Sequence, residues 1–184
     1  METLTNIATK VKQSCGMHTH CGAADLSLQH CKNLFKHYVK FKDVLDAMMP
    51  QSRRSSHDND CKSLLYRFEC GNRTQTINCA FAAIDHASSL EDLYSNVTGR
   101  DRYFKLNLLP FWQHDTLEFR QHAGTVDADK ACQWVLFLGT WMERALATNP
   151  KKVTEREFTV RRAWKTEFDT TLARLCSTSS ISPA

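Results

Sequence analysis

The pattern of apolar positions between residues 26 and 48 is the clearest structural signal in the chain. Apolar side chains recur there at every third or fourth position: Leu28, Cys31, Leu34, Phe35, Tyr38, Phe41, Val44, Leu45 and Met48. This spacing places the side chains on one face of an α-helix. It predicts one long helix over 26–48, capped by Asp25 or Ser27 and ended by Pro50.

Further stretches have helical or alternating patterns. Helical spacing predicts helices at 3–13, 78–87, 90–97, 128–147 and about 158–176. Ser88 or Ser89 can cap the helix at 90–97, and Asp127 the helix at 128–147. Alternation predicts strands at 17–21, 64–70, 102–108 and 116–122. In the strand at 102–108, Tyr103, Lys105 and Asn107 would share a polar face, opposite a buried apolar face.

The composition is that of an ordinary globular protein, with 42% hydrophobic and 24% charged residues among 184. The chain has no internal repeat and no interior linker, so we expect a single domain over 1–176 and a disordered tail at 177–184. No apolar run reaches the roughly 18 residues that span a bilayer, and we therefore expect no membrane segment.

Charge and cysteine content narrow the classes of protein further. The net charge of +4 is mild and the basic residues are spread along the chain, so we expect no nucleic-acid partner. The N-terminus is polar and has no signal peptide, which predicts a cytoplasmic location with the eight cysteines reduced. Cys31, Cys79 and Cys132 have apolar neighbours and are expected to fill the core.

Candidate chemistry centres on two of the predicted strands. His18 and His20 share one face of the first, and Glu118 and Arg120 share one face of the last. If these strands are neighbours, the group could hold a divalent cation and an anionic substrate. The alternative is that the histidines lie on an exposed sheet face and that Glu118 and Arg120 form a cross-strand pair.

The polar loop at 51–60 adds two basic side chains. Arg53 and Arg54 could hold a phosphate or a substrate carboxylate, or they could be solvated. Catalysis by Cys15, Cys21 or Cys61 would need cations close to the thiol, and buried structural thiols are the preferred interpretation.

Four motifs occur in a fixed order: SCGMHTH at 14–20, SRR at 52–54 followed by Cys61, RYFKLNL at 102–108 and TLEFRQHAGT at 116–125. Together they resemble the family of putative amidoligases, which is grouped with glutamine synthetase and glutamate-cysteine ligase. The resemblance implies an α+β fold in which a mainly antiparallel sheet cups the site and helices pack on its other face. It also implies an ATP-dependent carboxylate-amine ligase that forms an amide bond through an acyl phosphate.

The resemblance implies roles for individual residues. Glu118 with His18 or His20 would bind Mg²⁺, and Arg120 would contact the transferred phosphate. Arg53 and Arg54 would hold phosphate or the substrate carboxylate. The remaining candidates, which would contact ATP or orient the acceptor, are His18, Tyr103, Lys105, Asn107 and His122. The expected partners are a small-molecule carboxylate and a small-molecule amine.

One departure from the family pattern concerns the metal. Family members begin with a strand that carries a Glu-x-Glu pair, whereas Glu2 is the only glutamate before His18 here. Mg²⁺ prefers oxygen ligands, so a His-His-Glu set suits Zn²⁺ or another transition metal better. We therefore expect one of three situations: the chain is an abbreviated form of the family domain, a second copy of the chain or a protein partner completes the site, or phosphoryl transfer has been lost. A catalytically silent binding protein that retains the pocket is therefore the main alternative, and a metal-dependent hydrolase is the third.

Overall fold

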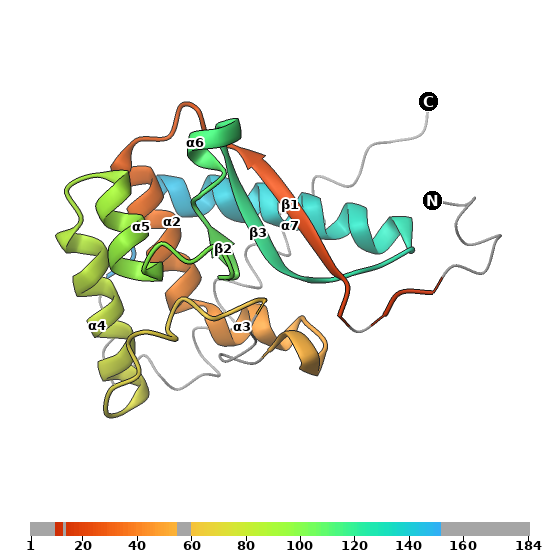
Figure 1. Ribbon diagram of the computed structural model, residues 1–184, viewed down its shortest axis with the longest axis horizontal. Coiled ribbons are helices and arrows are strands. Elements are labelled where there is room, and N and C mark those ends of the chain that lie inside the picture. Colours follow the sequence, from red (N-terminus) through yellow and green to blue (C-terminus); the bar gives the residue numbers. More distant parts are fainter. Residues whose placement is uncertain (1–9, 13, 55–59, 152–184) are drawn as a thin grey trace.

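The structure is a computed structural model that describes residues 10–12, 14–54 and 60–151. Its elements, in chain order, are β1 (Gly16–Gly22), α2 (Leu28–Lys40), α3 (Lys42–Ala47), the 3-10 helix η1 (Gln51–Arg53), α4 (Arg73–His86), α5 (Leu90–Thr98), β2 (Leu106–Asn107), α6 (Phe111–His114), β3 (Thr116–Ala123) and α7 (Ala128–Ala147). Helices and a small sheet occur in one unit, so the predicted α+β class is confirmed (Figure 1).

The sheet has three antiparallel strands in the order β1-β3-β2. Thr19 pairs with Phe119 and Met17 pairs with His122, so β3 has one more residue than β1 between these pairs. An extra residue of this kind is a β-bulge, which bends the strand and redirects its side chains. The bulge lies at Arg120 and Gln121, next to the predicted site.

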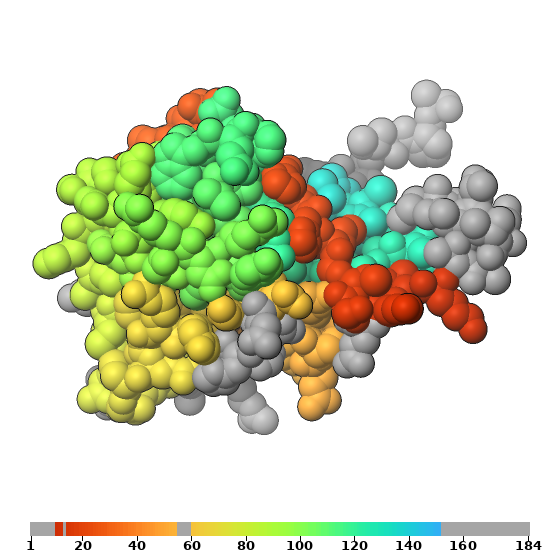
Figure 2. All heavy atoms as spheres, in the orientation of Figure 1, coloured from red at the N-terminus to blue at the C-terminus, as the bar shows by residue number. Residues whose placement is uncertain are grey.

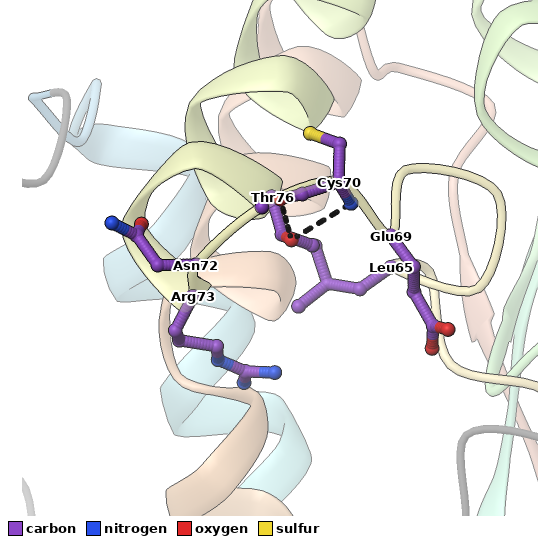
Figure 3. Close-up of a pocket in the computed structure, with 7 residues that line it drawn as sticks. Leu65, Glu69, Cys70, Asn72, Arg73 and Thr76 are labelled. Carbon is purple, nitrogen blue, oxygen red and sulfur yellow. Dashed lines mark hydrogen bonds between the residues drawn. The ribbon is translucent and has the colours of Figure 1, made fainter.

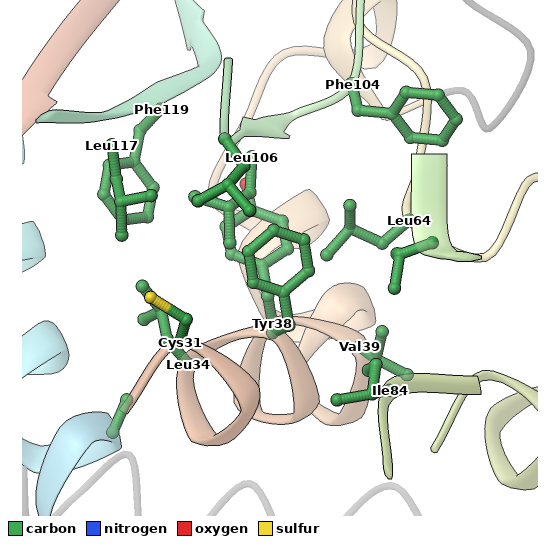
Figure 4. Packing of buried hydrophobic residues seen from close by; sticks show 14 of the residues in the cluster. Cys31, Leu34, Tyr38, Val39, Leu64, Ile84, Phe104, Leu106, Leu117 and Phe119 are labelled. Carbon is green, nitrogen blue, oxygen red and sulfur yellow. The ribbon is translucent and has the colours of Figure 1, made fainter. Parts of the chain in front are cut away.

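The helices α2 and α7 pack together behind the sheet, and α7 crosses behind β1 and β3 in Figure 1. Phe119 of β3, Tyr38 of α2 and Trp141 of α7 form an aromatic cluster with ring centroids 5.5–6.4 Å apart. Figure 4 shows Phe119 and Leu117 of β3 facing Leu34 and Tyr38 of α2. All four side chains are at most 2% exposed, so apolar burial fixes the helices against this face of the sheet.

The predicted helix at 26–48 is two helices. Ser27 caps α2, as predicted, but the chain leaves helical geometry at Phe41 (φ −97°, ψ 11°) before α3 begins. Both helices bury apolar side chains, so the apolar spacing continues across the break and conceals it. Pro50 follows the end of α3 as expected and precedes η1, which the pattern does not predict.

Two of the predicted strands are wrong in whole or in part. Residues 64–67 form turns and 68–70 are irregular, and the consecutive side chains of Leu64 and Leu65 are both buried. The strand at 102–108 is reduced to β2 and an isolated parallel bridge between Lys62 and Phe104. Two of the three residues of its expected polar face are buried, since Lys105 and Asn107 are 0% and 1% exposed, whereas Tyr103 is 40% exposed.

The remaining elements follow the sequence more closely. The strands at 17–21 and 116–122 are β1 and β3, α5 is capped by Ser89 and α7 by Asp127, and α4 begins at Arg73, before its expected start. Residues 10–12 are irregular; the rest of the helix expected at 3–13, the helix at 158–176 and the tail at 177–184 lie outside the described residues. Within the part of the chain that is described, no helix is both long and apolar enough to cross a membrane.

Candidate functional site

The site is built around the carboxylate of Glu118, in the middle of the central strand β3. Strand pairing places His20 of β1 on one side of Glu118 and Asn107 of β2 on the other. The neighbouring side chains of His18 and Arg120 reach the same carboxylate. The sheet therefore brings together five of the predicted residues, which we call the Glu118 cluster: His18, His20, Asn107, Glu118 and Arg120.

Both carboxylate oxygens of Glu118 have protein partners. Oε1 lies 2.8 Å from Nδ1 of His18 and accepts a hydrogen bond of 2.9 Å from Nη1 of Arg120. Nε2 of His20 is 3.8 Å from the same oxygen. Oε2 accepts a hydrogen bond of 2.7 Å from the side-chain amide of Asn107. Donors from all three strands thus converge on a single buried carboxylate.

The charged groups of the cluster shift the pKa values of Glu118 and His18. Burial would raise the pKa of Glu118, but the hydrogen bond from Asn107 and the charge of Arg120 outweigh it and hold the pKa below the ordinary value. Burial and the charge of Arg120 lower the pKa of His18, against the opposing effect of Glu118. At neutral pH the cluster therefore contains a carboxylate, a guanidinium and a neutral His18.

The two histidines are the solvent-accessible members of the cluster. Their side chains are 39% and 41% exposed, whereas those of Glu118 and Arg120 are 7% and 6% exposed. Figure 2 shows β1, which carries both histidines, crossing the surface of the molecule. A ligand would therefore meet His18 and His20 first.

Arg120 is held from several directions. Its guanidinium carbon lies 5.6 Å from the ring centroid of Tyr103, and Nη2 donates to the main-chain oxygen of Asp60 at 3.4 Å. Its Nε is buried and has no hydrogen-bond partner among the described residues. Tyr103 itself is 40% exposed, so it can shield Arg120 and still reach a ligand.

Arg53 lies beside the start of β1. Its Nη2 donates to the main-chain oxygen of Ser14 at 3.1 Å, and its Nε has no partner among the described residues. A Cβ added at Gly16 would lie 3.1 Å from Nη2, so the glycine allows Arg53 to pack closely against the strand. Only 5% of Arg53 is exposed, so its side chain is packed within the protein and is not the solvated loop side chain of the alternative interpretation.

His122 lies at the end of β3, where its ring is 5.1 Å from that of Trp134 on α7. Burial lowers the pKa of His122, against the effect of its hydrogen bond to the main-chain oxygen of Ala123. The charge of Arg53 also contributes to the lowered pKa of both His122 and His18, so Arg53 lies near both rings.

Arg54 and Lys105 do not join the cluster. Arg54 donates to the main-chain oxygens of Met49 and Ala47, near the end of α3. Lys105 donates to Oδ1 of Asp46 at 2.6 Å. Burial lowers the pKa of Lys105 even though Asp46 opposes that effect. The contacts of both residues are structural, and their roles in ligand binding stay predictions.

A buried polar network around Asp46 was missed by the sequence interpretation. Oδ1 of Asp46 accepts from Lys105 and from the amide of Gln121, and Oδ2 accepts from Lys42. Gln121 in turn accepts from the hydroxyl of Tyr38. The available signals were the spacing of Lys42 and Asp46, four residues apart on one helix, and the place of Gln121 on the apolar face of its strand.

The described residues do not fit a Mg²⁺ site. Glu118 is the one carboxylate of the cluster, both its oxygens are engaged, and Arg120 adds a positive charge beside it. His18 and His20 both approach the same oxygen of Glu118, with Nδ1 of His18 at 2.8 Å and Nε2 of His20 at 3.8 Å from Oε1. In the described part of the chain, no three His, Cys, Asp or Glu side chains form a group that could hold a metal ion.

A separate pocket of about 430 Å³ lies at the start of α4. Its lining consists of Leu65, Glu69, Cys70, Gly71, Asn72, Arg73 and Thr76 (Figure 3). None of the predicted site residues contributes to this pocket.

The protein is thus an α+β protein with a small antiparallel sheet and helices behind it. Its strands carry a cluster of Glu, Arg and His side chains. The chain belongs to the family described as putative amidoligase enzyme, whose model matches residues 1–142. The family predicted from the four motifs is therefore confirmed, and the matched range includes the whole Glu118 cluster. No curated protein and no solved structure matches the chain.

Proposed function

We propose that this protein forms an amide bond between a carboxylate and an amine, with ATP activating the carboxylate as an acyl phosphate. The observation that carries the proposal is the convergence of Arg120 and His18 on Glu118, within the range matched by the amidoligase family. Family membership supports a ligase, and the cluster supplies groups suited to anionic substrates.

The proposed reaction has two steps. A carboxylate oxygen attacks the γ-phosphorus of ATP and ADP leaves; the amine nitrogen then attacks the acyl carbon, phosphate leaves and the nitrogen loses a proton. Arg120, with Arg53 nearby, would neutralise negative charge on the anionic groups. His18 is neutral and accessible, so it can accept the proton from the amine.

Glu118 has a positioning role in this scheme. Its carboxylate fixes Arg120 through Nη1 and orients His18 through Nδ1, so that Nε2 of His18 is the nitrogen left for a substrate. Acidic metal ligands would come from a second copy of the chain or from a protein partner, since the described residues do not provide them.

A silent relative that binds ligands without turnover is the second candidate. It is favoured by one observation: Asn107, Arg120 and His18 already satisfy both oxygens of Glu118. A cluster that is complete without a metal can bind an anion at its histidines and need not transfer a phosphoryl group.

Calorimetric titration of the full-length protein with a non-hydrolysable ATP analogue, with and without Mg²⁺, tests the proposal. We expect Mg²⁺-dependent binding that is lost in Arg120→Ala and retained in the control His86→Ala, which changes an exposed histidine at the end of α4. Incubation with ATP, hydroxylamine and a panel of small carboxylates that includes glutamate should then yield a hydroxamate with at least one of them, because hydroxylamine traps an acyl phosphate. Binding without hydroxamate would favour the silent relative, and no binding at millimolar analogue would refute the ligase.

A further inference from the structure

Two cysteines outside the Glu118 cluster are in contact at the start of α4. The Sγ atoms of Cys70 and Cys79 are 3.2 Å apart and share a hydrogen bond. Both residues are exposed, so a reagent in solution can reach them. A disulfide bond measures about 2.05 Å, so the two sulfurs would need to approach each other by only about 1 Å.

The backbone holds the two cysteines in this arrangement. Oγ1 of Thr76 accepts from the main-chain nitrogen of Cys70 and donates to its main-chain oxygen (Figure 3). Gly71, at φ +53°, makes the turn that follows, and Asn72 caps α4. Cys79 comes three residues after Thr76 and therefore lies on the same side of the helix. Cys70 is thus tied to the helical face that presents Cys79.

The other cysteines have different environments. Cys31 and Cys61 are buried, and burial raises the pKa of Cys31 to about 12. Cys132 is exposed on α7, contrary to the prediction that it and Cys79 fill the core, because both occupy solvent-facing positions of their helices. Among the described residues, Cys70 and Cys79 form the pair whose sulfur atoms are in hydrogen-bond contact.

We propose that Cys70 and Cys79 are a site of reversible oxidation that forms a disulfide by exchange with a low-molecular-weight disulfide such as oxidised glutathione. The thiolate of Cys79 attacks one sulfur of the small disulfide and displaces the first small thiol. The sulfur of Cys70 then attacks Cys79 in the mixed disulfide and displaces the second small thiol. The small disulfide gains two electrons and the two protons given up by the protein thiols, and excess small thiol reverses the exchange.

Oxidation would change the start of α4 and the pocket beside it. The bond closes a loop that includes Gly71, the cap Asn72 and the first turns of α4. Such a link restricts the unfolded chain and opposes local opening of the helix. Cys70, Asn72 and Thr76 also line the pocket, so the bond would fix one wall of that cavity.

Tryptic mapping tests the proposal on the reduced full-length protein. The protein is equilibrated with mixtures of oxidised and reduced glutathione, its remaining thiols are alkylated, and it is digested without reduction. Cleavage after Arg67, Arg73 and Arg100 places Cys70 alone in peptide 68–73 and Cys79 alone in peptide 74–100. We expect these two peptides to appear as one linked species that dithiothreitol separates.

Two variants sharpen the test. Cys132→Ser removes another exposed thiol and should form the same linked species, whereas Cys79→Ser should form none. Thermal unfolding should occur at a higher Tm after oxidation of the unaltered protein and of Cys132→Ser, with no such rise in Cys79→Ser. The proposal is overturned if both peptides stay alkylated, if each carries glutathione separately, or if the linked species leaves Tm unchanged.

Discussion

Replacement of Asp46 by asparagine should strongly destabilise the fold. Asp46 is 6% exposed and its carboxylate neutralises Lys105, which is fully buried, and also contacts Lys42. The substitution leaves the ammonium group of Lys105 buried without a counter-charge, a change that costs about 3–5 kcal/mol. A domain has a free energy of unfolding of only about 5–15 kcal/mol, so the loss would be a large share of the total.

The loss should depend on pH in a definite direction. Burial already lowers the pKa of Lys105 in the folded protein, and removal of the Asp46 charge lowers it further, while the pKa of the unfolded chain is unchanged. The unfolded chain then binds more protons, so the free energy of unfolding rises with pH across the interval between the two pKa values. Asp46→Asn should therefore recover part of its stability as the pH approaches the ordinary lysine pKa of about 10.4.

Urea unfolding at pH 7 and pH 9 measures both effects. Asp43→Asn is the matched control on the same helix, because Asp43 is 48% exposed and its ion pair with Arg73 contributes only about 0–1 kcal/mol. Adding Lys105→Met to Asp46→Asn should restore much of the loss, since it removes the unpaired charge. If Asp46→Asn unfolds at the same urea concentration as Asp43→Asn, or if the double variant is no more stable than Asp46→Asn, then Asp46 does not stabilise the fold by neutralising Lys105.

Three further outcomes are expected. Glu118→Gln and Arg120→Ala should each abolish ligase turnover and keep a native circular dichroism spectrum, and an unfolded spectrum would instead assign them a structural role. Burial lowers the pKa of His37 to about 4, against the effect of its hydrogen bond to Thr148. The unfolded chain therefore takes up a proton before the folded protein does, and the free energy of unfolding should fall by roughly 3 kcal/mol between pH 7 and pH 4. In His37→Gln, urea unfolding should show a weaker dependence of this free energy on pH. Ser27→Ala removes the hydrogen bond that caps α2 and should lower the free energy of unfolding by about 1 kcal/mol in the same assay; no change would mean that the cap contributes nothing.

The sequence predicts the parts of the site that depend on strand alternation. Alternation places His18 with His20 and Glu118 with Arg120, and strand pairing then brings the two sets together at Glu118. The sequence does not predict that Lys105 is buried and paired with Asp46. Regular pairing in β2 covers only Leu106 and Asn107, so alternation does not extend to Lys105, which turns to Asp46.

The misassigned elements have the same kind of cause. The spacing of apolar residues indicates which side chains are buried, but it does not determine the backbone conformation between them. It therefore continues through Phe41, where α2 ends, and it resembles a strand at Leu64 and Leu65, where consecutive turn residues are both buried. Asp46 was missed because a carboxylate in a helix is ordinarily solvated, and only the three-dimensional fold brings Lys105 and Gln121 to it.

The motif residues thus form two groups, one around Glu118 and one around Asp46, and β3 contributes side chains to both. Arg120 and Asn107 point to Glu118, while Gln121 and Lys105 point to Asp46. Alternation along β3 allows this division, because the consecutive residues Arg120 and Gln121 face opposite sides of the sheet and contact different partners. The groups are also joined, since the main-chain nitrogen of Arg120 donates to the main-chain oxygen of Lys105 at 2.8 Å. The Asp46 network therefore stabilises the backbone that positions Arg120. A substitution in this network should lower the free energy of unfolding more than it weakens ligand binding.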